Sequence, residues 1–586
     1  MVDQPALPAA SPATDFPVTD FSAADTPDRR RTPALPAVSA WRFGLPSFWL
    51  VVVLAVALLV ALPVGIVLTR VFVPTDGVWS HLAATVLPRY LTNTALLMAG
   101  VGTGVLVIGV GTAWLVTMCR FPGRRVLEWA LLLPMAMPAY VMAYTYTDLL
   151  QFVGPVQTAL RETFGWTRQD YWFPNIRSLG GAAAMLTLVL YPYVYLLARA
   201  AFLEQSVCVL EVSRTLGSSA WRTFTRVALP LARPAIVAGL ALALMEVLAD
   251  FGTVQYFAVD TFTTGIYRTW FALGEPVAAA QLAAVLLLFV ATVMALERVS
   301  RGRARYHHST GRYRPLPSFE LRGIRAAGAL LACALPLLLG FIVPLLVLAD
   351  LSLGGGDALF GPVFLRLAGN SFTLAGITAV IAVALAAMVA YGLRMRPTPL
   401  LRGAARVAAM GYAVPGSVIA VGILIPAAAF DNTVDAFMRE TFGISSGLLL
   451  SGTIVALVYA YLVRFLAVSF NTVEASLGKI RPSLDMAARV LGYSPGGTMV
   501  RVHVPIMKGS LLTAGLLVFV DVMKELPATM IVRPFNFDTL AVRVYTLASD
   551  ERLAEASTAA IAIVAVGIIP VILLSRAIAA SRPGQG

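Results

Sequence analysis

The chain has 586 residues, of which 58% are hydrophobic and 13% are charged, and its mean hydropathy is +0.80. No ordinary water-soluble domain needs this balance, so the composition excludes a soluble enzyme or binding module and predicts an integral membrane protein. The formal net charge of +13 is interpreted as a topology signal, because Lys and Arg near helix ends favour the cytoplasmic side. Nucleic-acid binding is therefore not expected.

Residues 1–40 are rich in Pro, Ala, Asp and Thr without apolar periodicity, which predicts a disordered cytoplasmic tail. Beyond them, apolar segments near the ~20 residues needed to cross a bilayer recur, and helices satisfy their backbone groups in lipid. The expected fold is an all-α integral membrane protein with about 12 transmembrane helices. We expect six near residues 48–68, 92–118, 127–150, 179–202, 233–257 and 277–297, and six near 326–349, 371–393, 405–429, 447–468, 509–531 and 556–576.

Basic clusters indicate how the chain is oriented. The arginines at 29–31, 120–125 and 394–406 all fall on one side of the membrane if the N-terminus is cytoplasmic. Residues 298–325 hold eight arginines against the single acid Glu320, which is typical of a cytoplasmic linker. We therefore expect a first half at 41–297, a basic linker at 298–325, a second half at 326–586, and both termini inside.

Two polar, basic stretches between apolar segments match each other. Arg214 to Gly217 is followed by Leu229-Pro230, and Arg489 to Gly492 is followed by Val504-Pro505 at the same spacing. Arg226 and Arg501 hold the same place within the two stretches.

Other pairs keep the same order along the chain: Asn93 and Asn370, Pro138 and Pro415, Tyr191 and Tyr459, and Tyr193 and Tyr461. The chain is thus predicted to be two homologous halves. Six helices per half make the halves parallel, related by an axis along the membrane normal, with both loops cytoplasmic.

Four acidic residues follow the two loops. Glu246 and Asp250 are four apart, and Asp521 and Glu525 repeat that spacing in the second half, so on helices each pair would share one face. Ionisable groups in membrane segments are costly and usually line an enclosed or wet pathway, which predicts a transient, attractive lining for a cation. In the alternative interpretation these acids pair with Lys524, Arg233 or Arg533 and only fix helix packing.

The two loops resemble the EAA loop of bacterial ABC importer permeases. The first copy departs from the family pattern at Val212-Ser213, and the second has Met486 in place of the acid, with Asp485 one place earlier. The resemblance implies the type I importer permease fold, as two parallel six-helix repeats, with loops that seat in ATPase subunits. It assigns this coupling role to Glu211, Arg214, Gly217, Arg226, Pro230, Asp485, Ala487, Ala488, Arg489, Gly492, Arg501 and Pro505.

The chain has no phosphate-binding loop, since Gly478-Lys479 is followed by Ile480 and lacks the earlier glycine. We expect no catalytic residue, no stable metal site and no cofactor on this chain, with ATP and Mg²⁺ bound by the partner. The resemblance implies two ATP-binding subunits on the cytoplasmic side and an extracytoplasmic solute-binding protein, in the inner membrane of a bacterial cell.

The segments after the loops look like the ferric-iron branch of this family, in Met245 to Val254 and Thr261 to Tyr267, and in Asp521 to Thr529 and Arg533 to Leu540. Close relatives import thiamine, phosphonates or polyamines, and these remain alternatives. A secondary transporter is a second class, disfavoured by the matched loops although some carriers have parallel repeats. For a membrane enzyme we find no nucleophile with a base, no metal-ligand cluster and no cofactor motif.

Overall fold

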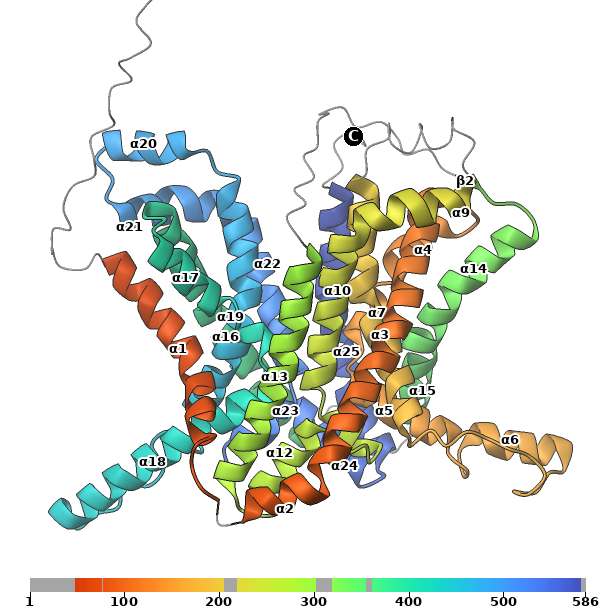
Figure 1. Ribbon diagram of the computed structural model, residues 1–586, viewed down its shortest axis with the longest axis horizontal. Helices are drawn as coiled ribbons and strands as arrows, with labels where there is room; N and C mark the ends of the chain where they lie inside the picture. The colour runs from red at the N-terminus through yellow and green to blue at the C-terminus, as the bar shows by residue number, and fades with distance from the viewer. Residues whose placement is uncertain are drawn as a thin grey trace, which may run out of the picture. The chain divides into compact units, whose positions relative to one another are not determined.

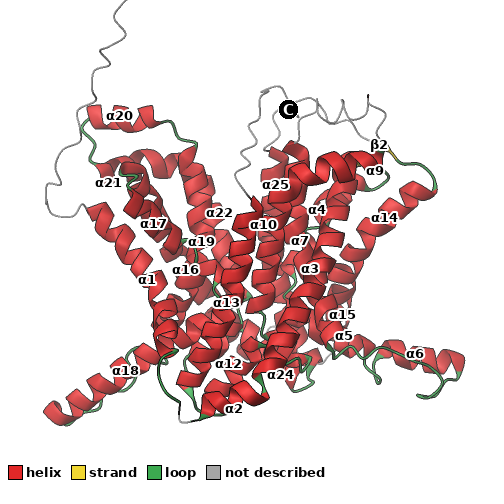
Figure 2. Cartoon of the chain, viewed as in Figure 1, coloured by secondary structure: helices red, strands yellow, loops and turns green. Residues whose placement is uncertain are grey.

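The computed structural model describes residues 48–75, 77–204, 215, 219–301, 319–354 and 361–580, and residues 48–586 form one compact unit. Within the described residues, eleven helices are long and apolar enough to cross a membrane, and a bent helix pair makes a twelfth candidate. The chain is therefore an all-α membrane protein, as predicted (Figure 2). The predicted tail at 1–40 and residues 302–318 of the predicted linker lie outside the described residues.

The first half contains six candidate spans, counting the bent pair. Its elements are α1 (Phe48–Arg70), α2 (Val78–Thr85), α3 (Leu87–Met118), β1 (Cys119–Arg120), α4 (Arg124–Ala130), η1 (Leu133–Ala136), α5 (Ala139–Leu150), α6 (Pro155–Phe164), α7 (Leu179–Glu204), α9 (Ala220–Thr223), η2 (Phe224–Ala228), α10 (Leu229–Ala249), α11 (Gly252–Tyr256), α12 (Phe262–Phe271) and α13 (Pro276–Arg301) (Figure 1).

The second half repeats this order. Its elements are β2 (Phe319–Glu320), α14 (Ile324–Leu337), η3 (Leu338–Ile342), α15 (Val343–Leu353), α16 (Pro362–Met395), α17 (Pro399–Ala408), η4 (Gly411–Ala413), α18 (Gly416–Phe442), α19 (Ile454–Gly478), α20 (Pro482–Val490), α21 (Pro495–Thr498), η5 (Met499–His503), α22 (Val504–Met523), α23 (Pro527–Val532), α24 (Leu540–Ser549) and α25 (Leu553–Ala580). The short strands β1 and β2 pair in parallel.

The third span of each half is broken, so continuous helices at 127–150 and 405–429 were wrong. Pro138 and Pro415 stand at the breaks with ψ of 138° and 141°, and α5 and α18 start directly after them. The preceding residues, Met137 and Val414, are extended with ψ of 120° and 124°. Proline disfavours the helical region for the residue before it and cannot donate a backbone hydrogen bond. The two breaks therefore fall at matching places.

The first span of each half packs against the other half. Helix α1 contacts α16, α17 and α18, and α14 contacts α3 and α4. Two tyrosines also form hydrogen bonds between the halves: the Tyr459 hydroxyl donates to the Leu59 carbonyl at 2.7 Å, and the Tyr146 hydroxyl to the Leu339 carbonyl at 2.6 Å. The halves are thus interlocked and do not form separate compact units.

Matching hydrogen bonds bear out the internal repeat. The Asn93 amide donates to the Asp260 carbonyl at 2.9 Å, and the Asn370 amide donates to the Asp538 carbonyl at 3.0 Å. The pentapeptide Arg-Glu-Thr-Phe-Gly, which the sequence analysis missed, occurs at 161–165 and again at 439–443. Both copies end a helix with a left-handed glycine, Gly165 at φ +68° and Gly443 at φ +67°.

We expect Gly422→Ala to destabilise the protein, because a Cβ there would come within 2.3 Å of the Pro63 carbonyl oxygen where α18 meets α1. Overpacking a close contact typically costs about 1–3 kcal/mol. Gly376→Ala is the control, since a Cβ at that position in α16 meets nothing within 4 Å. Thermal unfolding of the detergent-purified chain would compare them. Equal midpoints for the two variants would contradict the interlocked packing.

Candidate translocation cavity and coupling loops

All four predicted pathway acids line one cavity between the halves. The cavity holds about 120 Å³ and is lined by Glu246, Asp250, Asp521 and Glu525 together with Arg464 and Lys524. We call these six side chains the central charge cluster. A second cavity of about 560 Å³ shares Asp521, Lys524, Tyr193 and Tyr412 with the first and is lined further by α10, α13, α19 and α25. The acids therefore meet where a path between the halves would run.

The prediction that each pair of acids lies on one helix was wrong. Helix α10 ends at Ala249, one residue before Asp250, and α22 ends at Met523, two residues before Glu525. Asp250 instead accepts hydrogen bonds from the Val254 N–H at 3.1 Å and the Thr253 hydroxyl at 2.9 Å. Glu525 accepts from the N–H groups of the residues three and four places on, at 2.8 and 3.0 Å. Both acids thus cap the free N–H groups of the short helices α11 and α23.

Two cations complete the cluster. The Lys524 ammonium lies 3.0 Å from Asp521 Oδ1. This ion pair is one of those expected in the alternative interpretation, in which the acids only fix helix packing. The Arg464 guanidinium, on α19, lies 3.8 Å from Glu246 Oε2 and 3.7 Å from Glu525 Oε1. Arg464 was not among the predicted site residues, although an arginine inside an apolar span is itself a signal of a functional or wet site. Of the other proposed partners, Arg533 pairs with Asp538.

A tyrosine pair joins the halves beside the cluster. The hydroxyl oxygens of Tyr193 on α7 and Tyr412 on η4 lie 3.3 Å apart, and both rings line the two cavities. Tyr191 is buried and donates to the Leu131 carbonyl at 2.9 Å. Tyr461 shares a hydrogen bond of 2.7 Å with the Thr529 hydroxyl. Of the repeated tyrosines, Tyr193 faces the path and the others serve packing.

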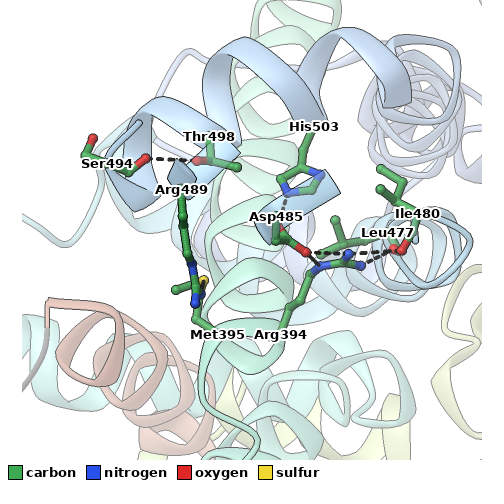
Figure 3. Close-up of polar contacts among 9 residues, drawn as sticks. All are labelled: Arg394, Met395, Leu477, Ile480, Asp485, Arg489, Ser494, Thr498 and His503. Atoms are coloured by element: carbon green, nitrogen blue, oxygen red, sulfur yellow. Dashed lines mark hydrogen bonds and ion pairs between the residues drawn. The ribbon is translucent and has the colours of Figure 1, made fainter. Parts of the chain in front are cut away.

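The second loop is fixed by a half-buried acid at its centre, Asp485 (Figure 3). Asp485 accepts hydrogen bonds from Arg394 Nη2 at 2.6 Å and Arg394 Nε at 2.9 Å, and lies 2.6 Å from His503 Nε2. Arg394 also donates to the carbonyls of Leu477 and Ile480 at 2.7 and 2.9 Å. Burial would raise the pKa of Asp485, but the hydrogen bonds from Arg394 and His503 outweigh it and hold the pKa below its usual range. This acid therefore ties α20 to α16 and η5, and Arg394 extends the connection to α19.

Both loops end in the same local structure. Ser219 and Ser494 each cap the short helix that follows, accepting from the backbone N–H three residues on at 3.3 and 3.1 Å. Each short helix then widens into one π-helical turn, η2 or η5. Pro230 and Pro505 come just after these turns and cannot donate to the carbonyl four residues earlier, which accounts for the widening. Residues 220–228 and 495–503 are therefore matching helical segments at the ends of the two loops.

The remaining loop residues present an exposed surface. Glu211, Arg214 and Gly217 lie outside the described residues. Ala488 is buried, and exposed positions are Arg226, Pro230, Ala487, Arg489, Gly492, Arg501 and Pro505. Gly492 has φ +79°, which side chains rarely adopt. Next to it Val490 is 88% exposed and Leu491 75% exposed. Figure 1 shows α9 of the first loop and α20 and α21 of the second at the same end of the protein.

Comparison with known proteins agrees with this geometry. Residues 105–305 match the sequence model of the binding-protein-dependent transport system inner membrane component. Residues 105–305 therefore resemble a binding-protein-dependent permease domain. The chain is 27% identical over 544 residues to the Fe(3+)-transport system permease protein FbpB 2 of Haemophilus influenzae, covering 91% of this chain and 98% of that protein.

Two shorter similarities involve permeases for other solutes. The molybdenum transport system permease protein ModB of Escherichia coli is 29% identical over 202 residues, which is 33% of this chain and 85% of that protein. The sulfate transport system permease protein CysT of the same species is 30% identical over 151 residues, which is 25% of this chain and 50% of that protein. The chain thus resembles permease proteins of Fe(3+), molybdenum and sulfate transport systems.

Asp485→Asn is expected to loosen the second loop of the permease. Losing a charged hydrogen-bond partner costs about 1.5–3 kcal/mol, so amide hydrogen exchange in α20 and η5 should quicken about tenfold or more. Because the folded-state pKa of Asp485 is lowered, this stabilisation is present at neutral pH and is lost as the pH falls through that value. Asp550→Asn, at an exposed residue, is the control. Unchanged exchange in Asp485→Asn would show that the acid does not hold the loop.

In the first half, Asp250 caps α11 and Glu246 lines the cavity, so we expect substitutions of the two acids to affect different properties. Asp250→Ala removes the α11 cap and should cost about 0.5–2 kcal/mol, seen as a lower unfolding midpoint of the purified permease. Glu246 lies 3.8 Å from Arg464, beyond hydrogen-bond distance, so Glu246→Gln should keep the midpoint and lower uptake in reconstituted vesicles. If Glu246→Gln lost stability in step with uptake, Glu246 would be a packing residue only.

Proposed function

We propose that this permease is the membrane-spanning subunit of an ATP-driven importer that receives ferric iron from a solute-binding protein and releases it into the cytoplasm. The observation that carries the proposal is the similarity to an Fe(3+)-transport permease over 91% of the chain. The four acids that line the central cavity support it, because Fe(III) is a hard cation suited to oxygen ligands.

Energy is proposed to come from two ATP-binding subunits that dock on the duplicated loops. Each loop offers arginines and apolar side chains to a partner: Arg226 and Trp221 in the first loop, Arg501 and Val490 in the second, all exposed. A surface of this kind that occurs twice at one end of the protein suits two copies of one soluble partner. ATP and Mg²⁺ belong to that partner, and this chain acts in translocation rather than in catalysis.

The proposed orientation places the loops and both termini in the cytoplasm. The larger cavity supports this direction, because its lining residues Leu242, Asn471 and Leu517 lie between the charge cluster and the loop ends of α10, α19 and α22. The cavity therefore leads from the cluster toward the proposed ATPase side. The solute-binding protein is expected at the opposite end, and the chain as a multi-pass protein of the bacterial inner membrane.

Among the described residues, no three His, Cys, Asp or Glu side chains lie close enough together to hold a metal ion. An importer must release its cargo, so a loose lining suits transport better than a closed coordination cage. Thiamine, phosphonate and polyamine import are the competing substrate assignments within the same permease class.

Reconstitution with the ATPase and the binding protein tests both parts of the proposal. Ferric iron, but not thiamine, phosphonate or spermidine, should stimulate ATP hydrolysis and enter the vesicles. Gly492→Val should uncouple the loop, because valine strains a φ of +79°, and should lower stimulated hydrolysis and uptake at least tenfold. Gly369→Val, where a Cβ meets nothing within 4 Å, should leave both unchanged. Stimulation by another solute would reject iron, and wild-type rates in Gly492→Val would reject the coupling role.

A further inference from the structure

Arg464 is buried in the central cavity without the hydrogen bonds that a guanidinium normally makes. Its side chain is 8% exposed, and both carboxylates near it lie 3.7 Å or more away. Among the described residues, its Nε and Nη1 atoms have no hydrogen-bond partner. A Cβ at Gly416 would come within 2.6 Å of Nη1, so the first residue of α18 is a glycine where the guanidinium needs room. Burying hydrogen-bond donors without partners costs free energy, so such donors are rare in proteins.

The two cations of the cluster occur in only one half. Three residues after Tyr193 the first half has Leu196, and three residues after the matching Tyr461 the second half has Arg464. Lys524 stands just before the cap Glu525, and Ala249 stands just before the cap Asp250. The caps are duplicated because both halves need them to satisfy the free N–H groups of α11 and α23. The repeated fold does not require Arg464 or Lys524. We therefore attribute these two cations to an interaction with the cargo.

Hydrogen-bond donors of Arg464 remain unused in the cavity, whereas three of the four acids have partners. Asp250 and Glu525 accept hydrogen bonds from the N–H groups of α11 and α23, and Asp521 pairs with Lys524. The buried Tyr140 hydroxyl also lines the cavity and, among the described residues, has no hydrogen-bond partner. The cluster has four carboxylates against two cations, so the acids would attract a metal ion to the cavity, whereas Arg464 would repel an ion that came next to it. An oxyanion would pair with Arg464, because guanidinium groups bind oxyanions through charge-assisted hydrogen bonds.

We propose that the central cavity is an oxyanion subsite, in which Arg464 binds an oxyanion that crosses the membrane as or with the cargo. This rests on the proposed import function and names the chemical form of the cargo. The oxyanion has two possible sources: it is a ligand of the ferric ion, or it is the free solute. In the first case Glu246 faces the metal side of the complex while Arg464 holds the anion.

Binding is measured first, on the purified full-length permease in detergent. Phosphate and sulfate, each against chloride at the same ionic strength, should raise the wild-type unfolding midpoint by at least about 2 °C, because a ligand that binds only the folded state stabilises it. Arg464→Leu, which copies Leu196 of the first half, should abolish that shift, and Arg464→Lys should keep part of it. Arg366→Leu, at an exposed arginine of α16, should respond like wild type. A wild-type protein with no shift, or a shift that survives in Arg464→Leu, would overturn the subsite.

Transport then separates the two sources. Vesicles with the ATPase and the binding protein receive ⁵⁵Fe(III) with [³²P]phosphate. Entry of both labels in a fixed ratio, lowered at least tenfold in Arg464→Leu, supports a ferric–oxyanion complex. Phosphate entry without iron supports the free solute and rejects the ferric proposal while the subsite stands. Iron entry without phosphate, and equal in wild type and Arg464→Leu, overturns the subsite while the ferric proposal stands.

Discussion

Two prolines set the internal architecture of this permease. A backbone without partners cannot face hydrocarbon, yet Pro138 and Pro415 each end the helical ladder in the middle of a span. The broken ends must therefore lie inside the protein, where polar groups can gather. Pro138 and Ala139 line the central cavity, and Gly416 approaches Arg464. The cavity exists because the third spans cannot run straight through.

The internal repeat separates what the fold requires from what the site requires. Residues that satisfy backbone groups occur in both halves, such as Asn93 and Asn370 and the caps Asp250 and Glu525. The cations Arg464 and Lys524 occur once, opposite the apolar residues Leu196 and Ala249. A duplicated structure thus encloses an asymmetric centre, and that asymmetry carries the chemistry by which a cargo would be recognised.

The loops and the cavity are mechanically connected by single helices. Helix α10 begins at the π turn η2 and ends at Ala249, three residues after Glu246, and α22 begins at η5 and ends two residues after Asp521. A shift of either loop therefore moves an acid of the cluster through one continuous helix. Asp485 joins α20 to the same assembly through Arg394 and His503. Asp485 acts within the loop, and the exposed apolar residues beside it form the surface that a partner would meet.

The sequence by itself determined the membrane class, nearly all of the spans, the two halves and the two loops, because apolar length and repeated spacing are local properties that need no three-dimensional partner. It also selected the four acids that meet in the cavity. It did not determine what they do, since the capping role of Asp250 and Glu525 depends on where α10 and α22 end. Only the tertiary structure decided that α1 packs on the opposite half, that Arg464 faces Glu246 from a distant helix, and that Asp485 turns inward to Arg394. Each of these contacts joins residues 91 or more positions apart, and no local pattern encodes a pairing at that separation.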